Sequence, residues 1–593
     1  MAAPKFFVDE SKPWFNSGLW PDGVPKNYEF PAMTLSEMLD EQVKNQPEAK
    51  AIWFLDTDVT YEQLGHYVDS FATALSERGV KKGDVVTMLL PNSIQYVVCY
   101  YATVKIGAIA SGINPTYKPL EILHQLDEVG SKVLVVLNSL YATQVAPIIA
   151  KHKLDLLITT SAVDLAYGLG FKRILGKLLK KELKGKVPGA VKFMDLLKTP
   201  PNVPKVEIDP INDPAVYMMT GGTTGVPKGA VLTHFNCVSN AIQCKFTQFD
   251  RKPGMAIVGI LPLFHSFAMT VVMNGGICLG FRIMLWPQPP AMNVFVDDLL
   301  KYGPKGGTIF PGVEVLFNRL AMYLKQHPEL KGELAGMFRL CTSGAGPLHR
   351  YVKDPFEQYT GAKLVEGYGL AEASPVVSTG PFNNKDQPGK IGLPLTGTDW
   401  GIFDAGDFSK GMKPIYPGEG DPKEEERDTY TGEICVCGPQ VMKEYLNRPE
   451  ETAETLKTYN GRTWLLTGDI GFMDATGQIT IRDRKKQMIK VKGYAVFPKE
   501  VEDLIGRHEA VRDVAVAGIP DKETGELVKA WVTLKPEVNG NITSEKLLEW
   551  CRENLSRYKV PKEIEILDEI PMTMTGKVMR RTLQERDPRY SKK

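Results

Sequence analysis

Two largely apolar runs near the N-terminus, residues 85–90 and 132–137, constrain the fold of this chain more than its other features do. Continuous apolar runs of this length are typical of strands that are buried on both faces of a sheet. Ahead of the first run, Leu64, Val68 and Phe71 recur at the spacing of an amphipathic helix. Strands that alternate with helices predict a parallel sheet with crossover connections, and therefore an α/β fold.

The composition is that of an ordinary globular protein. Hydrophobic residues make up 43% and charged residues 24%, which excludes a disordered chain, a collagen and a coiled coil. The length of 593 residues corresponds to about four domain-sized units, or to fewer if large sheets merge into one body. A formal net charge of +1 gives no global field, so we expect no nucleic-acid partner.

Cysteine and histidine usage argues against disulfide and zinc chemistry. The eight cysteines are scattered, and the close pair Cys435 and Cys437 lacks the two-residue gap of a metal or redox motif. We interpret this pair as two residues on one face of a strand, in a reducing compartment. No HExxH pattern is present, and the first 15 residues lack the apolar core of a signal peptide. The expected location is therefore the cytoplasm.

An uncharged run over residues 255–281 is long enough to span a bilayer. It contains Pro262, His265, Asn274 and Gly275, which break a helix and bring polar groups that lipid would not satisfy. We therefore expect a buried strand, a loop and a helix here rather than a transmembrane helix.

A basic amphipathic segment occupies residues 171–187. Its apolar residues lie on one helical face, and seven Lys or Arg residues with one Glu give a local net charge of +6. This pattern is typical of a helix that lies on an anionic membrane surface, here the inner face of the cell membrane. The alternative is an ordinary surface helix whose apolar face packs on the core.

A glycine- and threonine-rich segment, residues 217–229 (YMMTGGTTGVPKG), follows an apolar strand. Glycines allow backbone N–H groups to turn toward an anion, hydroxyl groups add donors, and Lys228 adds a positive charge. The order Pro-Lys-Gly differs from the Gly-Lys-Ser/Thr of the nucleotide hydrolases. A flexible linker is the alternative, but it does not explain the Pro-Lys-Gly ending. We therefore predict a phosphate-binding loop.

Six further motifs follow this loop in order. They are LPLFHSF at 261–267, TSGAGP at 342–347, EGYGLAE at 366–372, WLLTGD at 464–469, DRKKQMI at 483–489 and PMTMTGKVMRR at 571–581. With these motifs, the chain resembles the adenylate-forming (acyl-CoA synthetase) superfamily, and most closely the bacterial long-chain fatty-acid–CoA ligases.

The resemblance implies an α/β fold with a large N-terminal body of two stacked α/β sheets and a small β-barrel. A small mobile α+β domain would follow. We place the boundary near Arg484, in a dense charge run. Residues 1–484 would form the domain that binds ATP and the acyl group, and residues 485–593 the mobile domain with the catalytic lysine.

The implied activity is that of an ATP-dependent fatty acid–CoA ligase, with ATP, Mg²⁺ and coenzyme A as cofactors or co-substrates. A carboxylate would form an acyl-adenylate and release pyrophosphate, and CoA would then displace AMP. Medium- to long-chain fatty acids are the expected substrates. The alternatives are a CoA ligase for an aromatic or alicyclic acid, an acyl-AMP ligase without CoA transfer, and a membrane fatty-acid transporter. A homodimer is compatible with the resemblance.

For the polyphosphate and metal, the resemblance implies that the loop closes over the β- and γ-phosphates. Glu372 would act in catalysis by holding Mg²⁺, together with Thr224. The loop residues expected to bind ATP are Thr220, Gly221, Gly222, Thr223, Thr224, Gly225 and Lys228.

For the nucleoside, the resemblance implies that Tyr368 stacks on the adenine and that Asp469 accepts hydrogen bonds from both ribose hydroxyls. Arg484 would donate to the same sugar, with a surface salt bridge as the alternative. The wall of the adenine pocket would be formed by the small residues Gly344, Ala345 and Gly346.

Two predicted catalytic residues and the hinge complete the site. Lys577 would bridge the carboxylate and the α-phosphate, although taken alone it belongs to a solvated basic tail. His265 would lie near the acyl carboxylate, or else be a buried structural residue. Lys486 would be the hinge about which the C-terminal domain rotates, bringing the Gly493 loop to the CoA channel.

The acyl pocket is expected in the apolar segment after His265, which contains small residues, with the stretch 308–313 as another wall. Two positions depart from the family pattern: Ala371 replaces a threonine near the phosphates, and Gln487 replaces an aspartate after the hinge. The acyl-pocket residues are predicted to be Met269, Gly275, Gly276 and Gly312.

Overall fold

The protein is described as a computed structural model of the chain. The described residues are 4–170, 185–220, 227–247, 252–381, 389–418, 420–485, 487–491, 494–521, 524–536, 538, 542–555, 557–573 and 578–590. Most of the basic segment 171–187 lies outside them, so its membrane contact stays a prediction.

The two apolar runs form neighbouring strands in the middle of an eight-stranded sheet. They are β3 (Val85–Leu89) and β5 (Ser131–Leu137), which pair in parallel, as predicted. Crossover helices connect the parallel strands, and antiparallel strands extend one edge. The sheet order is β19 (Glu444–Tyr445), β9 (Lys228–Thr233), β8 (Pro214–Thr220), β4 (Ile109–Gly112), β3, β5, β6 (Leu156–Thr160) and β7 (Val191–Lys192).

A nine-stranded sheet forms the second layer of the N-terminal body. Its middle is parallel and both of its ends are antiparallel. The order is β16 (Leu393–Pro394), β15 (Val376–Thr379), β14 (Leu364–Gly369), β13 (Phe338–Ser343), β12 (Thr308–Gly312), β10 (Ala256–Gly259), β11 (Arg282–Leu285), β1 (Lys50–Phe54) and β2 (Thr57–Thr60).

One hydrophobic core joins the two sheets. It contains Val86 and Met88 of β3 together with Ile52 and Trp53 of β1. Helix α4 (Ile94–Lys105) lies in this core and has eleven of its twelve residues buried, which explains why its sequence is apolar on every side. The predicted pair of stacked α/β sheets is thereby confirmed.

The uncharged run 255–281 folds inside this core. It forms β10, a loop, the π-helical turn η5 (Ala268–Asn274) and helix α10 (Gly275–Leu279), so the prediction of a strand, a loop and a helix is confirmed. Among the described residues, no helix combines the length and the apolar character that crossing a membrane requires.

The third sheet is an antiparallel half-barrel, which corresponds to the small barrel that the resemblance implied. Cys435 and Cys437 both pack in one hydrophobic cluster with Phe403 and Trp464, so they share a face of β18 as expected. The strands are β17 (Asp399–Phe403), β18 (Gly432–Cys437), β20 (Leu456–Tyr459), β21 (Arg462–Met473) and β22 (Ile479–Arg484).

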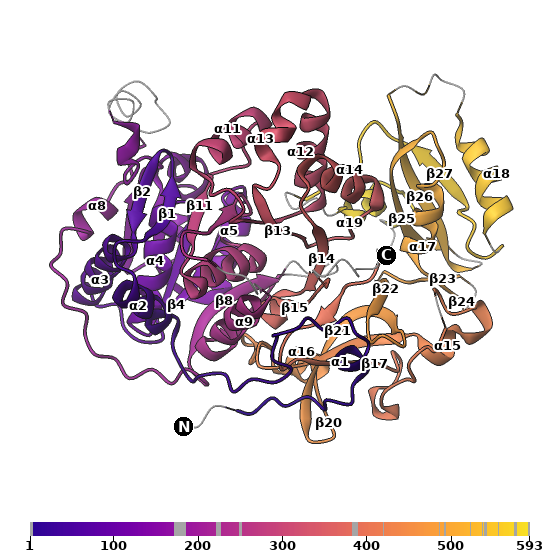
Figure 1. Cartoon of the computed structure of the whole chain (residues 1–593), viewed down its shortest axis with the longest axis horizontal. Helices are drawn as coiled ribbons and strands as arrows, with labels where there is room; N and C mark the ends of the chain where they lie inside the picture. Colours follow the sequence, from indigo (N-terminus) through magenta and orange to yellow (C-terminus); the bar gives the residue numbers. More distant parts are fainter. Residues whose placement is uncertain are drawn as a thin grey trace.

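The C-terminal part has its own α+β core at one end of the molecule, coloured orange to yellow in Figure 1. Its sheet begins with β23 (Ile489–Val491), five residues after the half-barrel ends. The predicted boundary at 484 and the mobility of this part stay predictions. The remaining elements are β24 (Tyr494–Val496), β25 (Val511–Asp521), β26 (Gly525–Leu534), β27 (Glu563–Ile566), α17 (Pro498–Ile505), α18 (Ser544–Asn554) and α19 (Arg580–Glu585).

Candidate active site

A cavity of about 2090 Å³ lies where the two large sheets, the half-barrel and the C-terminal part meet. Residues of all four units line it, including Met219, Phe267, Asp469 and Lys499. Segments far apart in the sequence therefore reach one space. The predicted site residues that line this cavity are Thr220, Lys228, His265, Gly344, Ala345, Gly346, Tyr368, Glu372, Asp469 and Arg484.

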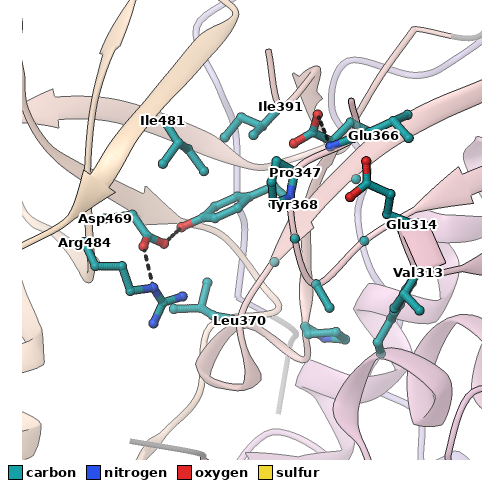
Figure 2. Close-up of a pocket in the computed structure, with 18 of the residues that line it drawn as sticks. Val313, Glu314, Pro347, Glu366, Tyr368, Leu370, Ile391, Asp469, Ile481 and Arg484 are labelled. Atoms are coloured by element: carbon teal, nitrogen blue, oxygen red, sulfur yellow. Dashed lines mark hydrogen bonds and ion pairs between the residues drawn. The ribbon is translucent and has the colours of Figure 1, made fainter. Parts of the chain in front are cut away.

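Three of these residues form a connected polar cluster (Figure 2). The Tyr368 hydroxyl donates to Asp469 Oδ2 at 2.6 Å, and Arg484 Nε lies 2.9 Å from Asp469 Oδ1. Asp469 and Arg484 are direct partners across the antiparallel strands β21 and β22. Asp469 is only 2% exposed. The ion pair with Arg484 and the hydrogen bond from Tyr368 hold its carboxylate in one orientation.

Burial and charge favour the protonated forms of Tyr368 and Arg484. Burial, helped by the neighbouring Asp469, raises the pKa of Tyr368, so its hydroxyl remains a donor. The Asp469 carboxylate raises the pKa of Arg484. A carboxylate with further lone pairs at a cavity wall is chemically suited to accept hydrogen bonds from a diol.

The small residues after β13 have different local roles. A Cβ on Gly344 would meet the Phe267 ring at 2.9 Å, so glycine allows close approach of this aromatic ring. Gly346 has open space within 4 Å of the position of a Cβ. Ala345 has a φ of +65°, a left-handed conformation that costs energy for a residue with a side chain. The loop therefore combines close packing, open space and backbone strain.

Strands β8 and β9 present the ends of the predicted phosphate loop. Thr220 and Lys228 are direct partners in this antiparallel pair, so the two residues that flank the predicted loop lie side by side. Lys228 Nζ lies 3.7 Å from Glu451 Oε1 and 5.1 Å from the ring centroid of Tyr445. The Tyr445 hydroxyl donates to Glu372 Oε1 at 2.7 Å.

Metal binding in the cavity would depend on few protein carboxylates. The described part of the chain contains no group of three or more His, Cys, Asp or Glu side chains that could hold a metal ion. Magnesium in phosphate-transferring sites is commonly held by one or two carboxylates, with the substrate phosphates and waters completing its shell. Glu372, one of several carboxylates that line the cavity, suits an arrangement of this kind.

His265 lies on the loop before η5 and lines the cavity. Its Nδ1 accepts a hydrogen bond from the Phe267 N–H at 3.3 Å, which places the proton of the neutral ring on Nε2. The ring orientation is therefore set by its own loop.

The four predicted acyl-pocket residues do not line the cavity. A Cβ on Gly276 would meet Ile283 at 2.8 Å, and one on Gly312 would meet the Phe317 ring at 2.8 Å. Met269 is 2% exposed and packs in the core, and Gly275 would place a Cβ 3.0 Å from the Thr270 carbonyl oxygen. The apolar side chains that do line the cavity near them include Cys244, Ile257, Phe267, Val271, Leu279 and Ile309.

Some predicted site residues lie outside the described part of the chain, and their roles stay predictions. They are Gly221, Gly222, Thr223, Thr224, Gly225, Lys486, Gly493 and Lys577.

The two departures from the family pattern have clear surroundings. Ala371 lines the cavity beside Glu372, so a hydroxyl is missing from this wall. Gln487 Oε1 accepts a hydrogen bond from Arg580 at 3.2 Å, and Arg580 also forms a two-pronged ion pair with Glu502 at 2.7 Å. Since Glu502 already pairs with the guanidinium, a neutral acceptor suffices at position 487.

Sequence reasoning missed Tyr445 and the acidic pair Glu314 and Glu366. Glu366 lines the cavity and accepts from the Leu348 N–H at 3.3 Å, and burial raises its pKa to about 7 (Figure 2). Glu314 accepts from His349 Nδ1 at 2.8 Å. Glu366 begins the EGYGLAE motif, so its position was a usable signal, whereas Tyr445 lies outside every motif used.

The model of the AMP-binding enzyme family matches residues 39–446, and that of the AMP-binding enzyme C-terminal domain matches residues 500–577. The chain belongs to the AMP-binding enzyme family. Relatives of this AMP-binding enzyme include the long-chain-fatty-acid–CoA ligase of Bacillus subtilis, 37% identical over 98% of this chain and 99% of that protein. The long-chain-fatty-acid–CoA ligase of Escherichia coli O6:H1 is 34% identical over 97% and 98%.

Solved structures share the fold of this AMP-binding enzyme. ATP-bound MatB from Rhodopseudomonas palustris superposes with a TM-score of 0.76 at 24% identity, covering 93% of this chain and 99% of MatB. The predicted family and its fold are thereby confirmed.

Proposed function

We propose that the chain is an ATP-dependent long-chain fatty-acid–CoA ligase that forms acyl-CoA through an acyl-adenylate. The observation that carries the proposal is a single cavity in which Asp469, Arg484, Lys228 and Glu372 share space with apolar side chains such as Val271. The two relatives cited above, matched over nearly their full lengths, are named for this activity.

In the first half-reaction, a fatty carboxylate oxygen forms a bond to the α-phosphorus of ATP. The bond between the α-phosphorus and the bridging oxygen breaks, and pyrophosphate leaves. Lys228 and the loop 220–225 would bind the polyphosphate, while Tyr368, Asp469 and residues 344–346 would hold the adenosine. Fixed cations and donors of this kind favour charge that develops on the phosphates. Mg²⁺, held by Glu372 and Thr224, would supply further neutralisation of that charge.

In the second half-reaction, the CoA sulfur forms a bond to the acyl carbonyl carbon and AMP leaves with its phosphate oxygen. His265 would orient the acyl carbonyl between the pocket and the CoA channel. The C-terminal part would rotate about Lys486, withdrawing Lys577 and bringing the Gly493 loop to the cavity.

The test is a panel of fatty and aromatic acids, assayed for pyrophosphate release with and without CoA. We expect release with medium- and long-chain fatty acids and thioester formation when CoA is added. Absence of fatty-acid-dependent release would refute the proposal, and release without thioester would indicate an acyl-AMP ligase.

The variant Lys577→Ala tests the assignment of the two steps. We expect it to lose pyrophosphate release from ATP, yet to convert supplied acyl-AMP and CoA into thioester at a rate near that of the wild type. Equal loss of both half-reactions would contradict the role given to Lys577.

A further inference from the structure

Tyr445 lies between two side chains that the proposed function assigns to MgATP. Its hydroxyl donates to Glu372 Oε1 at 2.7 Å, while Lys228 Nζ lies over its ring, 5.1 Å from the centroid. The residue is 8% exposed and lines the cavity. One side chain thus makes a charge-assisted hydrogen bond to the carboxylate and a cation–π contact with the ammonium group.

The backbone around Tyr445 holds the same two partners. The Met442 N–H donates to the Glu372 carbonyl oxygen at 2.7 Å, and the Leu446 N–H donates to the Gly229 carbonyl oxygen at 2.8 Å. This short segment therefore joins the turn that carries Glu372 to the strand that begins at Lys228. The ring of Tyr445 is fixed relative to both groups.

The remaining contacts of Glu372 and Lys228 leave both groups available for a ligand. Within the described part of the chain, Glu372 Oε2 has no hydrogen-bond partner. Lys228 Nζ has an acidic neighbour, Glu451, whose Oε1 lies 3.7 Å away. Without the Tyr445 hydroxyl, the Glu372 carboxylate would lose the bond that fixes its rotation.

We propose that Tyr445 is a positioning residue that sets the spacing between the Glu372 carboxylate and the Lys228 ammonium group for the polyphosphate of MgATP. It acts through these two side chains and not on the reacting atoms. The inference rests on the proposed function for the identity of the nucleotide ligand.

The experiment measures equilibrium binding of MgATP and of AMP to the full-length chain by calorimetry, without acid or CoA. The variant Tyr445→Phe keeps the ring and removes only the hydroxyl. A hydrogen bond to a charged group corresponds to about a tenfold change in affinity, so we expect MgATP to bind about tenfold more weakly. AMP, which lacks the β- and γ-phosphates, should bind within about twofold of the wild type.

The matched control is Tyr302→Phe. Tyr302 also donates its hydroxyl to a carboxylate, that of Asp56, but it does not line the cavity. We expect MgATP binding by this variant to be unchanged. Equal weakening by both variants, or equal weakening of MgATP and AMP by Tyr445→Phe, would overturn the inference in favour of a general structural effect.

A double-mutant cycle gives a second measurement that depends on the contact itself. In a Glu372→Ala background the hydroxyl has no carboxylate to position, so Tyr445→Phe should change MgATP affinity by less than about twofold. A full tenfold effect in that background would overturn the inference. Absence of MgATP binding by the wild type would refute the proposed function, whereas wild-type binding with no change in Tyr445→Phe refutes only the role of Tyr445.

Discussion

Asp469 contacts two of the residues that were predicted, separately, to bind the nucleoside. The resemblance assigned Tyr368, Asp469 and Arg484 each to a part of the ligand, and the structure connects the three side chains to one another. The individual residues could be predicted because each lies in a short motif. Their mutual contacts could not, since Asp469 meets Arg484 through the pairing of β21 with β22, and Tyr368 reaches Asp469 from strand β14 of another sheet.

Replacing Asp469 by asparagine tests this cluster. The change removes the charge that pairs with Arg484, but the Arg484 side chain is 37% exposed, so water compensates part of the lost ion pair. Because the change also weakens the proposed acceptor for the ribose hydroxyls, we expect kcat/KM for ATP in pyrophosphate release to fall by about tenfold or more. The control is Asp195→Asn, at an exposed ion pair with Lys198. A change of less than threefold at Asp469 would contradict the assigned role.

Glu366 predicts a pH dependence of stability. Burial raises its pKa to about 7 in the folded chain, above the value of about 4.3 that is usual for an unfolded chain. The folded state therefore holds a proton that the unfolded state has lost, so this residue's contribution to stability falls as pH rises from about 4.5 to 7. We expect Glu366→Gln to be increasingly more stable than the wild type across that range, by up to about 3 kcal/mol.

Chemical denaturation at several pH values measures this difference. Gln can still accept the hydrogen bond from the Leu348 N–H, so the packing is kept. A stability difference that stays constant between pH 4.5 and 7 would show that Glu366 does not titrate in this range.

At the scale of elements, apolar patterning predicted the buried strands, whereas the predicted acyl-pocket residues lie outside the cavity described above and stay a prediction. The runs at 85–90 and 132–137 form neighbouring strands. They could be predicted because burial on both faces of a sheet requires a continuous apolar run, which is visible locally in the sequence. The free volume beside a glycine leaves no such signal. The space beside Gly276 and Gly312 is filled by Ile283 and Phe317, which lie in the elements that directly follow each glycine.

The variant Gly276→Ala separates packing from substrate selection. Its Cβ would lie 2.8 Å from Ile283 and 3.2 Å from Ile257, so we expect a loss of about 1–3 kcal/mol in the free energy of unfolding. The preference for acyl chain length should not change, because Gly276 does not line the cavity. Gly332→Ala is the control, since nothing lies within 4 Å of its Cβ position. An altered chain-length profile in a fully stable Gly276→Ala would contradict this assignment.

Across the whole molecule, ion pairs connect the half-barrel to the C-terminal part. Arg427, in the connection between β17 and β18, lies 3.3 Å from Glu500 of α17, and Glu500 also accepts from Lys559 at 3.0 Å. The Lys499 N–H donates to Asp483 Oδ2 at 2.8 Å. The contact between Arg427 and Glu500 leaves no local signal in the sequence, because the two residues lie 73 positions apart.

Removing the Arg427 contact should loosen this arrangement. Both side chains are about a quarter exposed, so Arg427→Gln should lower the population of the orientation seen here by about two- to fivefold. We expect a larger radius of gyration in small-angle X-ray scattering of the ligand-free chain. Arg552→Gln, which breaks a pair within α18, is the control. Identical scattering curves for Arg427→Gln and the wild type would contradict the expectation.

The pairing of β21 with β22 has a consequence for how ligand and domain influence each other. Arg484 contacts Asp469, and the Lys485 N–H donates to the Gly468 carbonyl oxygen at 2.8 Å, immediately before the predicted pivot Lys486. A nucleotide that binds at this strand pair would shift the equilibrium between orientations of the C-terminal part. By thermodynamic linkage, the nucleotide affinities of two orientations then differ by the same factor as this shift. AMP would therefore be released most readily from the orientation that binds it most weakly.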